Sequence, residues 1–108
     1  MPIDHRARAA ALREKAGGAA GQTDPALRQS ILSRAAGGPA LTAPYDALVT
    51  HVAEASYRVT DGEVAAVRAA TGSDKAAFEV VMTAAIGAAL LRFDRATAAL
   101  EQAEYAPR

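Results

Sequence analysis

The sequence contains no cysteine among its 108 residues. The chain therefore has no disulfides, thiolate zinc sites or iron–sulfur clusters, and no cysteine nucleophile. Basic and acidic residues balance at 12 each, and this zero net charge argues against nucleic acid as the main partner. The longest uncharged run, residues 80–91, is too short for a membrane span of about 20 residues. With no apolar signal segment at the N-terminus, we expect a cytoplasmic protein.

Large apolar side chains are also scarce. Of the residues counted as hydrophobic, 30 are alanine, and Leu, Ile, Val and Phe together number only 20. A fraction this low raises the question of disorder, but disorder also requires a large net charge, which is absent. We therefore predict a folded, all-α, single-domain bundle of about five helices with a long central C-terminal helix.

Two stretches rich in glycine and proline, residues 17–21 and 37–39, interrupt the chain. We predict a basic, glycine-interrupted helical arm over residues 1–43 and a helical core over residues 44–108. The first 36 residues carry a net charge of +3, and the remainder carries −3. We expect the arm to lie against the acidic core of the same or a neighbouring subunit.

Capping residues mark where the helices begin. Asp24 directly precedes Pro25, which is typical of a helix start. Thr60 and Glu63 have the spacing of a capping box, and Ser73 is placed to cap the last helix. Together with the period of the apolar residues, these signals predict helices over residues 4–16, 24–36, 44–58, 61–71 and 74–105.

The first half of the last helix, residues 76–91, is apolar on nearly every side. Such a helix must be surrounded by protein, and four short helices can hardly cover all its sides. Its alanines and Gly87 leave little side-chain bulk, so a neighbouring backbone can approach closely. We therefore predict self-association through this helix into a homo-oligomer, or contact with a partner protein.

Glu79 is the first candidate for chemistry, because its neighbours Phe78 and Val80 are apolar. A carboxylate left unpaired in such surroundings has a raised pKa, as a general acid or base requires. The alternative is a structural carboxylate that lies at the edge of the helix or pairs with an arginine such as Arg58, Arg68 or one from another subunit.

His51 is the second candidate, since it shares a helix face with Glu54, three residues away. The pair suits a general base with its orienting carboxylate, or an ordinary surface pair without a catalytic role. No histidine spacing supplies the ligands of a metal site, and we expect neither a metal nor a cofactor. Arg58, Arg68 and Arg92 are candidates for holding a substrate carboxylate.

Three segments carry a family resemblance: VTDGEVAAVRAA (59–70), TGSDKAAFEVV (71–81) and LRFDRATAAL (91–100). Through these three segments, residues 44–100 resemble the C-terminal part of the carboxymuconolactone decarboxylase and alkylhydroperoxidase D superfamily. The peroxidase branch of that superfamily carries a Cys-x-x-Cys motif, which this chain lacks. The resemblance therefore implies no thiol peroxidase activity. It implies an all-α fold and symmetric oligomers, often trimers or hexamers, formed through long helices.

We expect a small non-catalytic helical protein that self-associates or serves as a partner subunit of a larger protein. The alternative is a carboxymuconolactone decarboxylase-like enzyme that performs decarboxylase- or isomerase-type proton transfer on a small acidic metabolite. Glu79 or His51 would then move the proton, inside an enclosed pocket faced by an arginine. A ligand- or metal-binding module built around His51 and Glu54 at a subunit interface is a third hypothesis.

Overall fold

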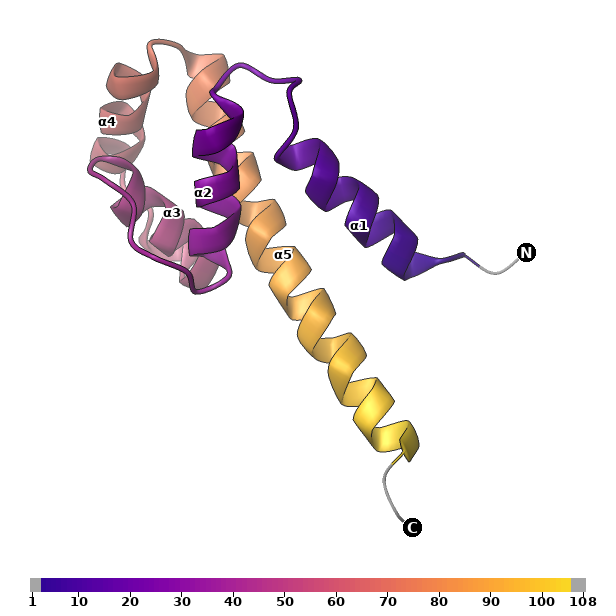
Figure 1. The fold of residues 1–108 in the computed structure, drawn as a ribbon. Helices are drawn as coiled ribbons and strands as arrows, with labels where there is room; N and C mark the ends of the chain where they lie inside the picture. Colours follow the sequence, from indigo (N-terminus) through magenta and orange to yellow (C-terminus); the bar gives the residue numbers. More distant parts are fainter. Residues whose placement is uncertain (1–2, 106–108) are drawn as a thin grey trace.

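The computed structural model describes residues 3–105 and confirms the all-α fold (Figure 1). Five helices and one short 3-10 turn follow one another, and no strand occurs in this range. The long C-terminal helix predicted for residues 74–105 is confirmed. The elements are α1 (His5–Ala16), α2 (Pro25–Ala35), α3 (Tyr45–Glu54), η1 (Ser56–Arg58), α4 (Asp61–Thr71) and α5 (Asp74–Tyr105).

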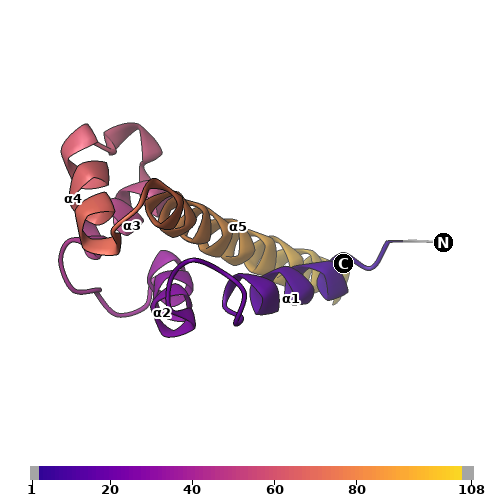
Figure 2. The same ribbon diagram turned by 90° about the horizontal axis from the view of Figure 1, so that it is seen from above.

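Helix α5 is the axis around which the other helices are arranged. Helices α2, α3 and α4 pack around its first half, while α1 lies beside its second half, which extends beyond the rest of the fold (Figures 1 and 2). The core between α2, α3, α4 and α5 is small, and alanines fill much of it. Its fully buried large side chains are Ile31, Leu48, Val49, Val67 and Val80.

The middle of α5 lets α2 approach closely, as the sequence predicts. A β-carbon added at Gly87 would lie 2.9 Å from the β-carbon of Ala35 and 3.0 Å from the carbonyl oxygen of Leu32. Real β-carbon contacts are longer than this, so α2 occupies the space that a side chain at position 87 would need. The glycine therefore allows the separation at which α2 and α5 pack.

The predicted caps are confirmed. The Asp24 carboxylate accepts a hydrogen bond from the second residue of α2 at 2.9 Å, and Ser73 caps α5 at 3.1 Å. The Thr60 hydroxyl accepts from the Glu63 backbone N–H at 3.1 Å, and the Glu63 carboxylate accepts from the Thr60 N–H at 3.0 Å. These hydrogen bonds cap α2, α4 and α5 at the starts that the sequence predicts.

The third helix ends earlier than predicted. Helix α3 stops at Glu54 rather than near Arg58, and the η1 turn fills the interval. Within α3, Leu48 and Val49 are buried, whereas Ser56, in η1, is exposed. The backbone of Ala55, with φ −155° and ψ 71°, is not helical, so Ser56 no longer follows the helical period of Leu48 and Val49.

Burial is uneven along α4, and one side of α5 stays uncovered, as expected of a helix that four short helices cannot enclose. In α4, Val67 is buried, but Val64 is 37% exposed and Ala70 is exposed as well. The apolar first half of α5 is not enclosed within the single chain, because Phe78 is 64% exposed and Met82 is 43% exposed. The other helices lie on the remaining sides of α5, so this side stays open.

The predicted arm, residues 1–43, holds two helices with different environments. Helix α2 contributes Ile31 and Ala35 to the core. Helix α1 buries no residue and lies along the second half of α5 (Figure 2). The structure therefore divides this segment at the 17–21 glycine stretch, with only α1 outside the core.

Helix α5 is also long and apolar enough to cross a membrane by length and composition alone. The longest uncharged run alone is too short for a membrane span. Helix α5 is nevertheless apolar enough, because a stretch of 18 residues within it has a high mean hydropathy and few charges. Within that stretch 44% of the residues are buried by the rest of the chain. The core helix of a soluble protein has the same properties, so the fold is compatible with a soluble protein.

Candidate functional site

Glu79 lies on α5 and receives donors from the loop that precedes α2. The backbone N–H of Gln22 donates to its Oε2 at 2.7 Å, and the backbone N–H of Thr23 donates to its Oε1 at 2.9 Å. The Thr23 hydroxyl donates to the same Oε1 at 2.5 Å. Arg28 of α2 completes the set, with its Nε 3.0 Å from Oε1. The carboxylate thus joins the loop and α2 to α5.

Arg28 is itself buried, with only 2% of its side chain exposed. Beyond Glu79, it donates to the carbonyl oxygens of Ala16 at 2.9 Å and Thr23 at 3.2 Å. A buried guanidinium is tolerated only where its charge and its donors are matched in this way. Arg28 therefore links the end of α1, the loop and α5 at one point.

Burial raises the pKa of Glu79, but the hydrogen bonds from Gln22 and Thr23 and the charge of Arg28 lower it more strongly. The pKa of Glu79 therefore lies below its ordinary value of 4.5. A general acid or base in this position would need an unpaired carboxylate with a raised pKa. Glu79 is therefore a paired, structural carboxylate, which was the alternative interpretation of the sequence. Its arginine is Arg28, not Arg58 or Arg68.

His51 pairs with a different carboxylate from the one expected. Its Nδ1 lies 2.8 Å from Oε2 of Glu63 on α4, while Glu54, on its own helix, is exposed and makes no such contact. Burial raises the pKa of Glu63, but the hydrogen bonds from Thr60 and the contact with His51 lower it more strongly, so that it lies below its ordinary value of 4.5. Glu63 is already the capping-box residue of α4, so the contact fastens α3 to the start of α4.

The three arginines proposed to hold a substrate carboxylate do not converge. Arg58 is exposed in η1, and Arg68 pairs with Asp74 at 2.8 Å on the surface between α4 and α5. Arg92 donates to the carbonyl oxygen of Ala53 at 3.0 Å, in the last turn of α3, where a cation meets the negative end of the helix dipole. Within residues 3–105, none of the three arginines pairs with Glu79 or His51.

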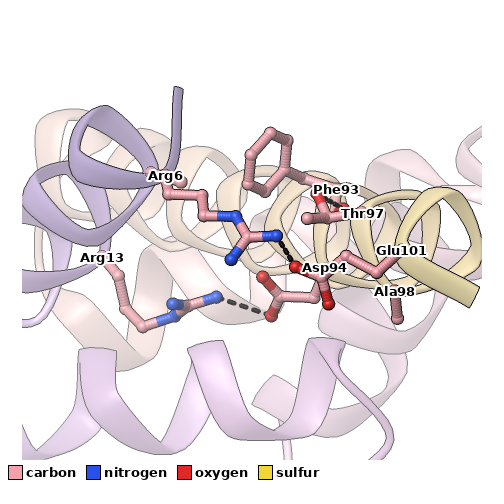
Figure 3. A pocket seen from close by; sticks show the side chains of 8 residues that line it. Arg6, Arg13, Phe93, Asp94, Thr97, Ala98 and Glu101 are labelled. Atoms are coloured by element: carbon pink, nitrogen blue, oxygen red, sulfur yellow. Dashed lines mark hydrogen bonds and ion pairs between the residues drawn. The ribbon is translucent and has the colours of Figure 1, made fainter. Parts of the chain in front are cut away.

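A surface hollow of about 310 Å³ lies between α1 and the second half of α5 (Figure 3). Arg13 reaches from α1 to Asp94 at 2.8 Å, and Arg6 pairs with Glu101. Seven residues back along α1, from Arg13 to Arg6, the partner lies seven residues forward along α5, from Asp94 to Glu101. The two helices therefore run antiparallel. Phe93 and Thr97 line the same hollow. The two arginines of the hollow are neutralised by its two carboxylates, and these four charged side chains are about half exposed.

An exposed, largely apolar surface lies along α5 on the side away from α1. Its residues, here called the free face, are all exposed and alternate in spacing between four and three residues. Figure 2 shows α1 and α2 on one side of α5, with the other side open for most of its length. The free face consists of Phe78, Met82, Ala85, Ala89, Arg92, Ala96, Ala99 and Ala103.

Sequence reasoning missed Arg28 and Thr23. Arg28 lies three residues before Ile31 and seven before Ala35, and these three are the buried residues of α2. That spacing was available in the sequence and would have placed a charged residue on the inner side of the helix. Thr23 carried no comparable signal, because its role depends on where the loop meets α5.

Across residues 3–105 no three His, Asp or Glu side chains gather in a way that could hold a metal ion. Comparison with protein-family models, with curated proteins and with solved structures found no match to the chain. The resemblance of residues 44–100 to the carboxymuconolactone decarboxylase and alkylhydroperoxidase D superfamily therefore rests on the sequence segments alone.

Proposed function

We propose that this chain is a non-catalytic helical protein that works by associating with a second protein surface, foremost that of its own copies. The observation that supports the proposal most directly is the free face of α5. Phe78 and Met82, the two large residues on it, are 64% and 43% exposed, and Leu100 beside it is 72% exposed. Contiguous exposed apolar surface of this kind is typical of interaction sites.

The groups that catalysis would need support the same proposal. Glu79 is held by Arg28 and the 22–23 backbone, and His51 is held by Glu63. Both side chains hold helices together at positions where an enzyme would need a group free to exchange a proton with a substrate. No observation favours the decarboxylase-like alternative over the association proposal. The cytoplasmic location stays a prediction from the sequence.

Light scattering on the purified chain tests the proposal with a matched pair of charge variants. Phe78→Glu places a carboxylate in the free face and is expected to reduce the measured mass to that of one chain, 11.1 kDa. Tyr57→Glu makes a comparable change at a residue that is 85% exposed in η1, and it is expected to leave the mass of the assembly unchanged. Equal masses for wild type and Phe78→Glu would contradict the proposal.

A further inference from the structure

The free face has the spacing of a helix-pairing seam. From Phe78 to Ala103 its eight positions follow one another at intervals of four and three residues, which is the repeat of a coiled coil. Seven of the eight residues are apolar, and all eight are exposed. Among residues 3–105 no second helix has a similar length with which to cover this seam. Another copy of α5 matches it in both length and spacing.

The residues on the seam are graded in size along the helix. The large side chains, Phe78 and Met82, lie at its start, and the last three apolar positions, Ala96, Ala99 and Ala103, are small. Two copies in parallel would stack large on large at one end and leave the alanines facing one another at the other. In an antiparallel pair each large residue meets a small one, so neither end of the pair brings two large side chains or only alanines together.

One antiparallel register uses the whole seam. In it Phe78 faces the partner's Ala103, Met82 faces the partner's Ala99, and Ala85 faces the partner's Ala96. Ala89 then faces the partner's Arg92 beside the two-fold axis. Each contact is repeated with the roles of the copies exchanged, as an isologous two-fold interface requires. A shift by one heptad in one direction would place Met82 opposite the partner's Arg92, and in the other direction it would take Phe78 and Met82 past Ala103, the last position of the seam.

Charges at the two ends favour the same orientation. Lys75 lies one turn before Phe78, and Glu104 follows Ala103, and both are exposed. An antiparallel pair brings Lys75 of each copy close to Glu104 of the other. A parallel pair would place lysine beside lysine and glutamate beside glutamate, and like charges that face each other across a helix pair oppose that pairing.

We infer that two copies of the chain pair through the free face of α5 in antiparallel orientation, with Phe78 of each copy against Ala103 of the other. The inference rests on the proposed function and adds the partner, its orientation and its register. The helices α1 and α2 lie away from this seam (Figure 2), and α3 reaches its edge at Arg92, which donates to the carbonyl oxygen of Ala53. The pairing also covers the side of α5 that the single chain leaves open.

Disulfide cross-linking tests the orientation, because the natural chain has no cysteine of its own. Ala85→Cys and Ala96→Cys are both mild changes at exposed positions, and one of the two proteins carries a mass tag. The proteins are mixed under reducing conditions, allowed to exchange and then oxidised. We expect a cross-linked dimer that contains one tagged and one untagged chain. Each variant oxidised alone is expected to give none, since the two copies of position 85 lie about 16 Å apart along the axis at a rise of about 1.5 Å per residue.

A Tyr57→Cys control measures random cross-linking at a residue outside the seam. Cross-linking of Ala85→Cys with itself above this background would overturn the antiparallel orientation. A dimer detected by light scattering that gives no mixed cross-link would overturn the inference while leaving the proposed self-association intact. A single-chain mass with no cross-link would overturn both. A single-chain mass with Phe78-dependent binding to phosphatidylcholine vesicles would likewise overturn both, in favour of a lipid surface.

Discussion

Arg28 Nε lies 3.0 Å from Glu79 Oε1, and this contact joins α2 to α5 in a place where the arginine is almost wholly buried. The sequence separates the two residues by 51 positions, and the loop residues Gln22 and Thr23 bind the same carboxylate. Because the chain has few large apolar side chains, its core is small, and this polar cluster supplies part of the stabilisation that a larger core would give to the helix packing.

Replacing Arg28 should therefore weaken the fold far more than replacing an exposed arginine. Arg28→Met removes the partner of a largely buried carboxylate and leaves the Ala16 and Thr23 carbonyl oxygens without their donor. We expect a loss of about 3 kcal/mol in the free energy of unfolding, measured by urea denaturation. Arg68→Met removes an ion pair whose two side chains are 62% and 79% exposed, and it should cost less than about 1 kcal/mol. Equal losses for the two variants would contradict the assigned role of Arg28.

Acid should destabilise the protein through carboxylates that are ionised in the folded state. A backbone hydrogen bond from Leu41 and the contact with Arg34 lower the pKa of Asp46 below its ordinary value of 3.8, and the pKa of Glu79 also lies below its ordinary 4.5. A depressed folded-state pKa contributes stability that is present above the unfolded value and is lost as the pH falls through the folded value. We expect the free energy of unfolding to begin to fall near pH 4.5 and to continue falling below pH 3.8.

The share of Glu79 in this acid response can be isolated. In Glu79→Gln the group no longer titrates, so the free energy of unfolding should depend less steeply on pH in the acid range, whatever the absolute stability of the variant. Urea denaturation at a series of pH values measures the slope. An unchanged slope would show that Glu79 titrates with the same pKa in the folded and unfolded states.

Helix α1 should detach from α5 at high salt. It buries no residue and is held to α5 by the exposed pairs Arg6–Glu101 and Arg13–Asp94, while Arg28 binds only the carbonyl oxygen of its last residue, Ala16. Salt screens exposed ion pairs, and an isolated helix of 12 residues is marginal in water. Hydrogen exchange should therefore show loss of amide protection in α1 at molar salt, while α2 stays protected. Protection in α1 that matches α2 at all salt concentrations would mean that α1 is held by something other than these pairs.

Two glycine-to-alanine changes should have opposite signs. In a helix interior alanine is ordinarily favoured over glycine by about 1 kcal/mol. At Gly62 in α4 a β-carbon meets nothing nearer than 3.8 Å, so Gly62→Ala should stabilise the protein. At Gly87 the β-carbon would meet α2 at 2.9 to 3.2 Å, so Gly87→Ala should destabilise it by forcing the helices apart. Thermal denaturation of both variants measures the signs, and a stabilised Gly87→Ala would contradict the close packing of α2 on α5.

Local signals in the sequence predicted the helices well. The caps at Asp24, Thr60 and Ser73 depend only on residues within one turn, and each forms the hydrogen bond that its spacing predicts. The long run of helix formers from residue 74 onward likewise predicted the extent of α5. Signals of this kind need no knowledge of which helix packs against which.

The partners of the candidate site residues could not be predicted in the same way. His51 meets Glu63 rather than Glu54, and Glu79 meets Arg28, because these contacts depend on how α3 packs on α4 and α2 on α5. The sequence identified Glu79 as a carboxylate in apolar surroundings, and only the fold shows that the neighbouring loop supplies its donors. The sequence did indicate that four short helices would leave part of α5 uncovered, but which residues form the open side depends on that packing.

Sedimentation equilibrium of the wild-type chain across the micromolar range tests directly whether the free face of α5 binds a second copy. We expect a mass of two chains, or an even multiple of one, with dissociation toward a single chain only on dilution. A mass of 11.1 kDa at every concentration would contradict it.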